Sequence, residues 1–363
     1  MTDSKIIITG GAGFIGSNLV RLILETTNHR VINIDKLSYA GVHASIADLI
    51  AHPRHDFECE DICDASRMRE LLAHYQPDAM MHLAAESHVD RSIDSPGEFI
   101  RTNVVGTYTL LEASLSYWSE LDAPAKDAFR FQHISTDEVY GTLGFDDAPF
   151  EETTAYDPSS PYAASKAAAD HLVSAWYRTY GFPSVITNCT NNYGPYQFPE
   201  KLIPLVIAKA VSGELIPIYG KGENVRDWIH VRDHAAALYA VLCNGLPGEN
   251  YNISADAERS NIDIVTTICQ LLDDLRPNDP VVPHAKLITY VTDRPGHDLR
   301  YAMKHDKITA ELGWQPLVSF EQGLAETVLW YLDNDEWRAA VTSGNYEGQR
   351  LGQRGSSSPP DSR

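Results

Sequence analysis

Hydrophobic and polar positions along the chain follow two alternating patterns. Short apolar or β-branched runs are typical of buried strands, and longer stretches with apolar residues every three or four positions are typical of amphipathic helices. Six short runs predict strands, at residues 5–9, 31–35, 57–60, 79–83, 129–134 and 184–188. Helical spacing falls between them, at residues 17–27, 65–75, 99–118 and 162–180.

This alternation predicts an α/β fold with a Rossmann-type, doubly wound parallel sheet, because parallel strands are joined by crossover helices. We expect residues 1–190 to form this domain, with a returning segment near 227–255. Proline and glycine interrupt the pattern from residue 191 onward. We therefore expect 191–226 and 256–340 to form a smaller, mixed α/β lobe that binds substrate. Residues 344–363 are rich in glycine, serine and arginine, so we expect a disordered tail.

The charge of the chain excludes some classes of partner. Lys and Arg total 29 and Asp and Glu total 50 among 363 residues, which gives a formal net charge of −21. So acidic a protein is a poor candidate for binding nucleic acid or an anionic membrane surface. An anionic ligand would have to be met by a few local cations or by backbone dipoles.

Cysteine usage and the N-terminus bear on location. The five cysteines are scattered and have no partners at zinc-site spacing, so we expect buried thiols in a reducing compartment and no metal. The N-terminus runs into a strand without a signal-peptide pattern, and no apolar run approaches transmembrane length. A cytoplasmic location is the expectation.

A glycine-rich turn separates the first predicted strand from the first predicted helix. It contains Gly10, Gly13 and Gly16, and Gly11 adds the spacing Gly-x-Gly-x-x-Gly. Such glycines permit a tight turn and let the backbone approach a pyrophosphate at the helix N-terminus. Asp35 ends the second strand, where a carboxylate suits ribose hydroxyls and would repel a 2′-phosphate. The sequence therefore predicts NAD rather than NADP as the cofactor.

Tyr162 and Lys166 stand four residues apart near the start of a predicted helix, so both lie on one face. A free tyrosine has a pKa of about 10 and is a poor base at neutral pH. A neighbouring ammonium and a positive nicotinamide ring would favour its phenolate. Lowering the pKa by about 3 units requires roughly 4 kcal/mol of differential stabilisation. The pair is a candidate for oxidising an alcohol beside the cofactor.

Residues 135–141 follow the fifth predicted strand and include Thr136, Asp137 and Glu138. Ligands of parallel α/β sheets bind at the carboxyl ends of strands, so this hydroxyl and these two carboxylates should project into a pocket. Adjacent acids are also common in solvated loops. The pair alone therefore does not define a reaction.

The glycine turn, Asp35 and the Tyr-x-x-x-Lys spacing together resemble the extended short-chain dehydrogenase/reductase family. Further segments resemble the branch of that family that dehydrates nucleotide sugars: AAESHVDRS at 84–92, STDEVYG at 135–141, NNYGPYQFPEKLIP at 191–204, RDW at 226–228 and DRPGHD at 293–298. The resemblance covers nearly the whole chain apart from the tail. Small departures at Ser38 and Thr190 touch no expected catalytic group.

The resemblance implies dTDP-glucose as substrate and a reaction in three parts. Tyr162, supported by Lys166, would take the proton of the 4-hydroxyl while hydride leaves carbon 4 for NAD. Glu138 would remove the proton from carbon 5, and a protonated Asp137 would donate to the leaving 6-hydroxyl. Hydride would then return to carbon 6, which gives a 4-keto-6-deoxy sugar nucleotide. Thr136 would hydrogen-bond the 4-oxygen.

The resemblance also implies two sets of contacts. Those to the cofactor are Gly10, Gly13, Phe14, Ile15, Gly16, Asp35, Lys36, Leu37, Ser38, Asp61, Ile62, Leu83, Ala84, Ala85, Ser87, Thr102, Tyr162, Lys166 and Asn192. Those to the nucleotide sugar are Ser87, Thr136, Asn191, Lys201, Leu202, Pro217, Tyr219, Arg226, Asn261, Arg294 and His297. The two arginines matter because a diphosphate needs directional cations in so acidic a chain.

Three other functions stay open at this point. A dehydratase of another nucleotide sugar would share these features, because base recognition lies in the irregular lobe. A nucleotide-sugar 4-epimerase would share the fold, NAD and the tyrosine–lysine pair, but it has no need of Asp137 and Glu138. A non-catalytic NAD-binding protein would need none of these side chains. The resemblance also implies a homodimer, in which helices 99–118 and 162–180 pair across a two-fold axis.

Overall fold

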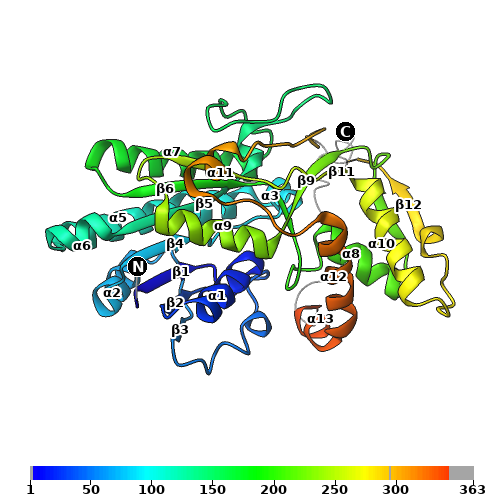
Figure 1. The fold of residues 1–363 in the computed structure, drawn as a ribbon, viewed down its shortest axis with the longest axis horizontal. Coiled ribbons are helices and arrows are strands. Elements are labelled where there is room, and N and C mark those ends of the chain that lie inside the picture. The colour runs from blue at the N-terminus through cyan, green and yellow to red at the C-terminus, as the bar shows by residue number, and fades with distance from the viewer. Residues whose placement is uncertain (1–2, 294–295, 343–363) are drawn as a thin grey trace, which may run out of the picture.

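The computed structural model describes residues 3–293 and 296–342, so Arg294 and the expected tail at 344–363 lie outside the described residues. The described chain forms a large parallel sheet with helices on both faces, and a smaller lobe lies beside it (Figure 1). The α/β fold class predicted from the alternating pattern is confirmed.

The large sheet contains seven strands within the described residues, in the order β10-β6-β5-β4-β1-β2-β3. All neighbouring strands run parallel. The strands are β1 (Lys5–Thr9), β2 (Arg30–Ile34), β3 (His55–Glu58), β4 (Ala79–His82), β5 (Arg130–Thr136), β6 (Ser184–Cys189) and β10 (Asn250–Ile253). The order reverses between β1 and β4, and open α/β sheets bind their ligands at such a switch point.

Helices cover both faces of this sheet. On one face lie α1 (Phe14–Thr26) and α9 (Val231–Asn244), and on the other lie α2 (Ala65–Tyr75), α5 (Thr107–Glu120) and α7 (Pro161–Tyr180). In β1, Ile6 and Ile8 enter the core beneath α1 and α9, whereas Ile7 enters the core beneath α2 and α5. Successive side chains of a strand point to opposite faces, so a strand buried on both sides must be apolar throughout.

The smaller lobe has a core of its own, built around Tyr193, Trp228 and Phe320. Its strands form one mixed sheet in the order β11-β9-β7 and one parallel pair, β12-β8. These are β7 (Asn191–Tyr193), β8 (Ile216–Tyr219), β9 (Val225–His230), β11 (Glu258–Ser260) and β12 (Ile288–Val291). Its helices are α8 (Leu202–Val211), α10 (Asn261–Leu275), α12 (Phe320–Asp333) and α13 (Asp335–Thr342).

Short helices complete the described chain. They are α3 (Val89–Asp94), α4 (Pro96–Phe99), α6 (Ala123–Ala128) and α11 (Asp306–Leu312), with the 3₁₀ turns η1 (His43–Ser45), η3 (Asp137–Tyr140) and η4 (His284–Leu287). The helix predicted at 99–118 differs from the structure, because a π-helical segment, η2 (Ile100–Gly106), precedes α5. The helix predicted to start at residue 17 begins at Phe14, directly after the extended Gly13. The third strand lies two residues earlier than predicted.

The glycine turn imposes a tight packing constraint on the fold. A Cβ at Gly16 would lie 2.1 Å from the carbonyl oxygen of Gly10. We expect Gly16→Ala to lower the free energy of unfolding by about 1 to 3 kcal/mol, the usual range for overpacking, as measured by urea denaturation. Gly97→Ala is the matched control, because a Cβ there would meet nothing within 4 Å. Equal stability of the two variants would contradict this packing argument.

Candidate active site

A cleft lies at the carboxyl ends of the strands, where the segments after β1, β2, β4, β5 and β6 meet residues 197–201 of the smaller lobe. Most of the residues predicted to bind or react line this cleft. They are Gly10, Gly13, Phe14, Ile15, Gly16, Asp35, Lys36, Ser38, Ile62, Leu83, Ala84, Ala85, Ser87, Thr102, Thr136, Asp137, Glu138, Tyr162, Lys166, Asn191, Asn192 and Lys201.

The N-terminus of α1 opens onto the cleft. Gly13 is the N-cap residue, and no side chain caps the first turn. Gly10 has φ +75°, and a Cβ there would lie 2.6 Å from the backbone nitrogen of Ala84. The turn therefore requires glycine, and it leaves the first N–H groups of a 13-residue helix for a ligand. This arrangement fits a diphosphate, which a helix N-terminus stabilises through N–H groups and the helix dipole.

The carboxylate of Asp35 is held at the edge of the cleft by backbone groups. The N–H of Ala12 donates to Oδ2 at 3.0 Å, and the N–H of Leu37 donates to Oδ1 at 2.8 Å. Burial raises the pKa of Asp35, and these two hydrogen bonds oppose that effect. A carboxylate fixed in this way can accept hydrogen bonds from vicinal hydroxyls, as the sequence predicted for a ribose.

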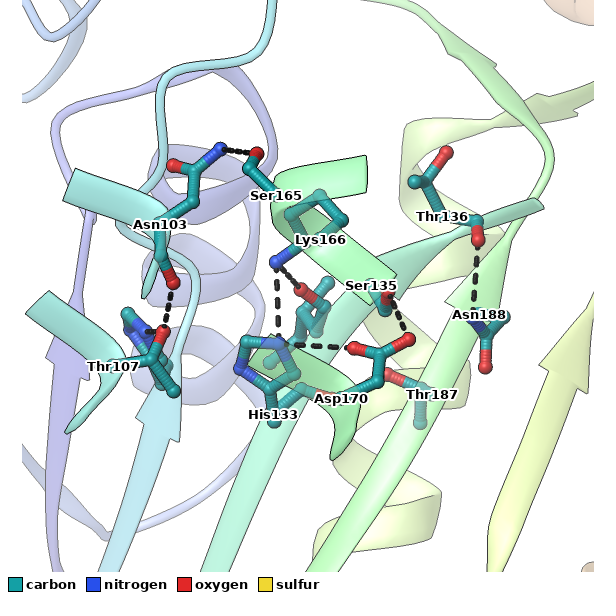
Figure 2. Close-up of polar contacts among 12 residues, drawn as sticks. Asn103, Thr107, His133, Ser135, Thr136, Ser165, Lys166, Asp170, Thr187 and Asn188 are labelled. Atoms are coloured by element: carbon teal, nitrogen blue, oxygen red, sulfur yellow. Dashed lines mark hydrogen bonds and ion pairs between the residues drawn. The ribbon is translucent and has the colours of Figure 1, made fainter. Parts of the chain in front are cut away.

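The polar residues at the end of β5 form a compact group. Thr136 Oγ1 donates to Asp137 Oδ1 at 3.2 Å and accepts the N–H of Glu138 at 3.3 Å. The Asn188 amide donates to the carbonyl of Thr136 at 3.0 Å, which ties the strand end to β6 (Figure 2). Asp137 is 2% exposed, and burial with the neighbouring Glu138 carboxylate raises its pKa well above the ordinary value. Burial of Asp137 therefore favours the neutral, protonated form of its carboxyl group.

Helix α7 places the tyrosine and lysine against this group. The helix begins at Pro161, where the hydroxyl of Ser160 caps it by accepting the N–H of Ala163 at 3.0 Å. Tyr162 consequently lies in the first turn, and Lys166 lies one turn further along the same face. Both residues are buried and line the cleft.

Lys166 is anchored to β5. Its Nζ donates to the carbonyl of Ile134 at 2.7 Å and lies 3.3 Å from His133 Nε2 (Figure 2). Burial lowers the pKa of Lys166 to about 8. Burial, followed by the Glu138 carboxylate, raises the pKa of Tyr162 well above 10. The protein alone therefore keeps Tyr162 protonated, and the expected phenolate requires an additional positive charge in the cleft.

The remaining predicted residues lie beside or beyond the cleft. Leu37 and Asp61 border the cleft. The N–H of Leu37 donates to Asp35, and the Asp61 carboxylate lies 3.9 Å from the ammonium of Lys36. The predicted substrate contacts of the smaller lobe that do not line the cleft are Leu202, Pro217, Tyr219, Arg226, Asn261 and His297.

Among these residues, Arg226 changes the pKa of Asp137. It is 5% exposed on β9, and its guanidinium lies 4.3 Å above the ring of Tyr301. Its charge lowers the pKa of Asp137, against the effect of burial. Tyr219 and His297 lie together, with ring centroids 6.1 Å apart. The smaller lobe thus brings a cation toward the acid pair, and it places an aromatic pair elsewhere in the same lobe.

Sequence reasoning missed several residues of the cleft wall, chiefly Tyr39, Glu86, Gln197, Phe198 and Glu200. Glu200 accepts from Arg91 Nε at 3.2 Å, and the Arg91 guanidinium lies 3.8 Å above the ring of Tyr39. This contact joins the loop after β2 to the segment before α8. Glu200 could have been found, because it directly precedes the predicted Lys201.

Two kinds of feature are absent from residues 3–293 and 296–342, the part of the chain that the structure describes. In that part of the chain no cluster of His, Cys, Asp and Glu is arranged to hold a metal ion. No helix there is long and apolar enough to cross a membrane.

Comparison with known proteins gives a consistent result. The family model described as GDP-mannose 4,6 dehydratase matches residues 7–327. A dTDP-glucose 4,6-dehydratase of Escherichia coli is 56% identical over 358 residues, which is 96% of this chain and 99% of that protein. A dTDP-glucose 4,6-dehydratase of Neisseria meningitidis is 57% identical over 350 residues, again 96% and 99% of the two chains.

Solved structures agree with the sequence comparison. The dTDP-glucose 4,6-dehydratase of Streptomyces venezuelae, crystallised with NAD, superposes with a TM-score of 0.84 at 43% identity, over 93% of this chain and 99% of that one. The UDP-glucose 4-epimerase of Thermotoga maritima superposes with a TM-score of 0.78 at 28% identity, over 91% and 99%. Backbone similarity therefore extends to epimerases, whereas sequence identity is higher to the dehydratase.

The raised pKa of Asp137 predicts a pH-dependent effect on stability. A carboxyl group whose pKa is higher in the folded than in the unfolded chain destabilises the fold as pH rises above its unfolded pKa of about 3.9. We expect Asp137→Asn to raise the free energy of unfolding by about 0.5 to 2 kcal/mol at pH 8, and by less at pH 4, in urea denaturation. Asp64→Asn is the control, because Asp64 has a lowered pKa and should gain no stability at pH 8. Equal gains for Asp137→Asn at both pH values would refute the raised pKa.

Proposed function

The chain belongs to the extended short-chain dehydrogenase/reductase family, in its nucleotide-sugar dehydratase branch, and we propose that it converts dTDP-glucose to dTDP-4-keto-6-deoxyglucose with NAD. One observation carries this proposal: a buried Asp137, whose pKa is raised above its ordinary value, stands beside Glu138 in the same cleft as Tyr162 and Lys166. Oxidation alone, or epimerisation, would need only the tyrosine and lysine. The high identity to dTDP-glucose 4,6-dehydratases over almost the whole chain supports the nucleotide.

NAD fits the residues of the first half of the cleft. The open N-terminus of α1 and the turn at Gly10 and Gly13 would hold its diphosphate. Asp35 would accept hydrogen bonds from the adenosine ribose. When bound, NAD would supply a hydride acceptor at carbon 4 and a hydride donor at carbon 6.

The chain's own residues move the protons. Tyr162, next to Thr136, would take the proton of the 4-hydroxyl, and the buried Lys166 would stabilise the resulting phenolate. The ketone at carbon 4 makes the hydrogen on carbon 5 acidic, and Glu138 would remove it. Asp137 would give its proton to the 6-hydroxyl, which leaves as water. Glu138 would return its proton to carbon 5 as the hydride reaches carbon 6.

The two lobes divide the ligands between them. We infer that 1–190 with 227–255 holds NAD, and that 191–226 with 256–340 holds the nucleotide end of the substrate. Asn191 and Lys201 line the cleft itself. Arg226 would supply a buried cation for the diphosphate from beyond the wall of the cleft.

We also infer a homodimer through η2, α5 and α7. Exposed apolar side chains gather on these helices, and the set comprises Ile100, Val105, Tyr108, Tyr177 and Tyr180. The rings of Tyr108 and Trp176 meet edge to face, with centroids 6.0 Å apart, so the helices share one surface. Pairing of this surface about a two-fold axis would build a four-helix bundle and bury these side chains.

The substrate is tested directly with the purified protein. Incubation with dTDP-glucose should yield the 4-keto product, detected by its absorbance in alkali. GDP-mannose and UDP-glucose, supplied in parallel, test the choice of nucleotide. Turnover of one of these but not of dTDP-glucose would replace the proposed substrate, and failure with all three while NAD is bound would overturn the dehydratase itself.

The division of roles predicts variants that stop part-way. Glu138→Gln and Asp137→Asn keep Tyr162 and Lys166, so both should still reduce bound NAD on addition of dTDP-glucose. Their rate of dehydration should fall by about 10²- to 10⁴-fold, the usual contribution of a general acid or base. NADH absorbance and product formation are followed together, and Tyr162→Phe should lose both. Dehydration at the normal rate by the two acid variants would show that these roles are wrong.

A further inference from the structure

Beneath the floor of the cleft, a group of buried polar side chains lies between β5 and α7 (Figure 2). It consists of His133 and Ser135 on the strand and Asp170 on the helix, one turn beyond Lys166. His133 is 0% exposed and Asp170 is 1% exposed. The reaction described above uses neither of them, although two of the three groups are titratable and buried.

The contacts of this group form a chain that ends on Lys166. Nε2 of His133 lies 3.3 Å from Lys166 Nζ and 3.2 Å from Asp170 Oδ1. The other carboxylate oxygen, Oδ2, accepts the hydroxyl of Ser135 at 2.8 Å. A single imidazole nitrogen therefore separates a buried ammonium from a buried carboxylate.

The chemistry of the ring decides how these contacts work. Burial and the nearby Lys166 charge lower the pKa of His133 well below 6.5, so the ring is neutral and carries one proton. Among the described residues, Nδ1 of His133 has no hydrogen-bond partner. An ammonium can only donate, so Nε2 accepts from Lys166 and the single proton of the neutral ring is on Nδ1. The Asp170 carboxylate lies 3.2 Å from the same nitrogen without accepting a hydrogen bond from it, so it acts on Lys166 through its charge.

We propose that Asp170 is the buried counter-ion of Lys166, acting across His133, and that it keeps the Lys166 ammonium charged beside Tyr162. Asp170 touches neither substrate nor cofactor, so it is a positioning residue. The link to Tyr162 rests on the proposed function, whereas the pairing of the two charges is a property of the folded chain. A buried ion is retained only where an opposite charge and hydrogen bonds compensate for lost water.

The pKa shifts of the two partners agree with this pairing. The charge of Asp170 raises the pKa of Lys166 against the effect of burial, and the charge of Lys166 lowers the pKa of Asp170 in return. The resulting values are about 8 for Lys166 and about 6 for Asp170. Both groups are consequently charged in the interval between these values.

Burial favours the neutral form of most other titratable groups around Lys166. On β6, burial raises the pKa of Cys189 to about 12, and on β4 burial lowers the pKa of His82 well below 6.5. On η3, burial and the Glu138 charge raise the pKa of Asp137, and the Glu138 charge raises the pKa of Tyr162. The Arg101 side chain of η2 is exposed. Burial, followed by the charge of Asp170, raises the pKa of Tyr156.

A double-mutant cycle tests the pairing without reference to activity. Asp170→Asn preserves the shape of the side chain and removes its charge, and Lys166→Met removes the opposite charge at similar volume. Each single variant should lower the melting temperature, and the double variant should melt above both single variants, because it leaves no unpaired buried charge. If a single variant does not fold, recovery of soluble protein in the double variant is the equivalent result. Additive losses in melting temperature, or no recovery, would overturn the pairing.

The pH dependence of the reaction tests the consequence for Tyr162. Lys166 is charged below its pKa and loses its proton as pH rises, so it sets an alkaline limb of kcat. Removing the carboxylate lowers that pKa, and in Asp170→Asn the alkaline limb should move to lower pH by about 1 to 3 units. Ser135→Ala is the control: it removes a hydrogen bond to Asp170 but no charge, so its limb should stay in place.

The outcomes separate the two proposals. A uniform loss of kcat in Asp170→Asn, with the alkaline limb unmoved, would reduce Asp170 to a structural role and overturn the inference. Absence of dehydration in the unmodified protein would overturn the proposed function instead. The melting-temperature cycle would still decide whether the two charges are paired.

Discussion

Burial of the Lys166 ammonium between β5 and α7 is the constraint on which the geometry of the site depends. Removing an ion from water costs several kcal/mol unless its surroundings compensate. Here the carbonyl of Ile134 and the His133–Asp170 pair lie against it, and all three are contributed by the strand and the helix themselves. Satisfying the lysine therefore fixes α7 relative to β5, and this fixes Tyr162 at the strand end where Thr136, Asp137 and Glu138 emerge.

The same dry environment separates the chemistry of neighbouring side chains. Asp137 and Glu138 are adjacent in the chain, but Asp137 is buried and its pKa is raised, so it can act as an acid. Tyr162 is also pushed toward its neutral form by burial and by Glu138. A positive charge brought into the cleft would reverse that effect, which couples proton removal from the substrate to occupancy of the cofactor site. The charge of Arg226, in the smaller lobe, lowers the pKa of Asp137 and so counteracts part of the effect of burial.

Much of this arrangement could be predicted from the sequence, because it depends on local spacing. The strand–glycine–helix order located the turn at Gly10 to Gly16, and the four-residue interval placed Tyr162 and Lys166 on one helix face. Ends of elements were less predictable: η2 inserts a π-helical segment into a helix whose apolar spacing appeared continuous. The contact between Glu200 and Arg91 was not predicted, because it joins segments 109 residues apart. Asp170, four residues after Lys166, could have been found by extending the same helix face by one more turn.

The sequence by itself determined the alternation of strands and helices up to residue 190, the glycine turn and the residue types that the reaction needs, because each of these depends on neighbours within a few positions. Only the tertiary structure decided which of these side chains are removed from water together. It showed that Asp137 is buried beside Glu138, that Lys166 lies against His133, and that Arg226 approaches from the other lobe. Those facts set the protonation states, and burial and charge proximity arise from contacts between distant segments that no local pattern specifies.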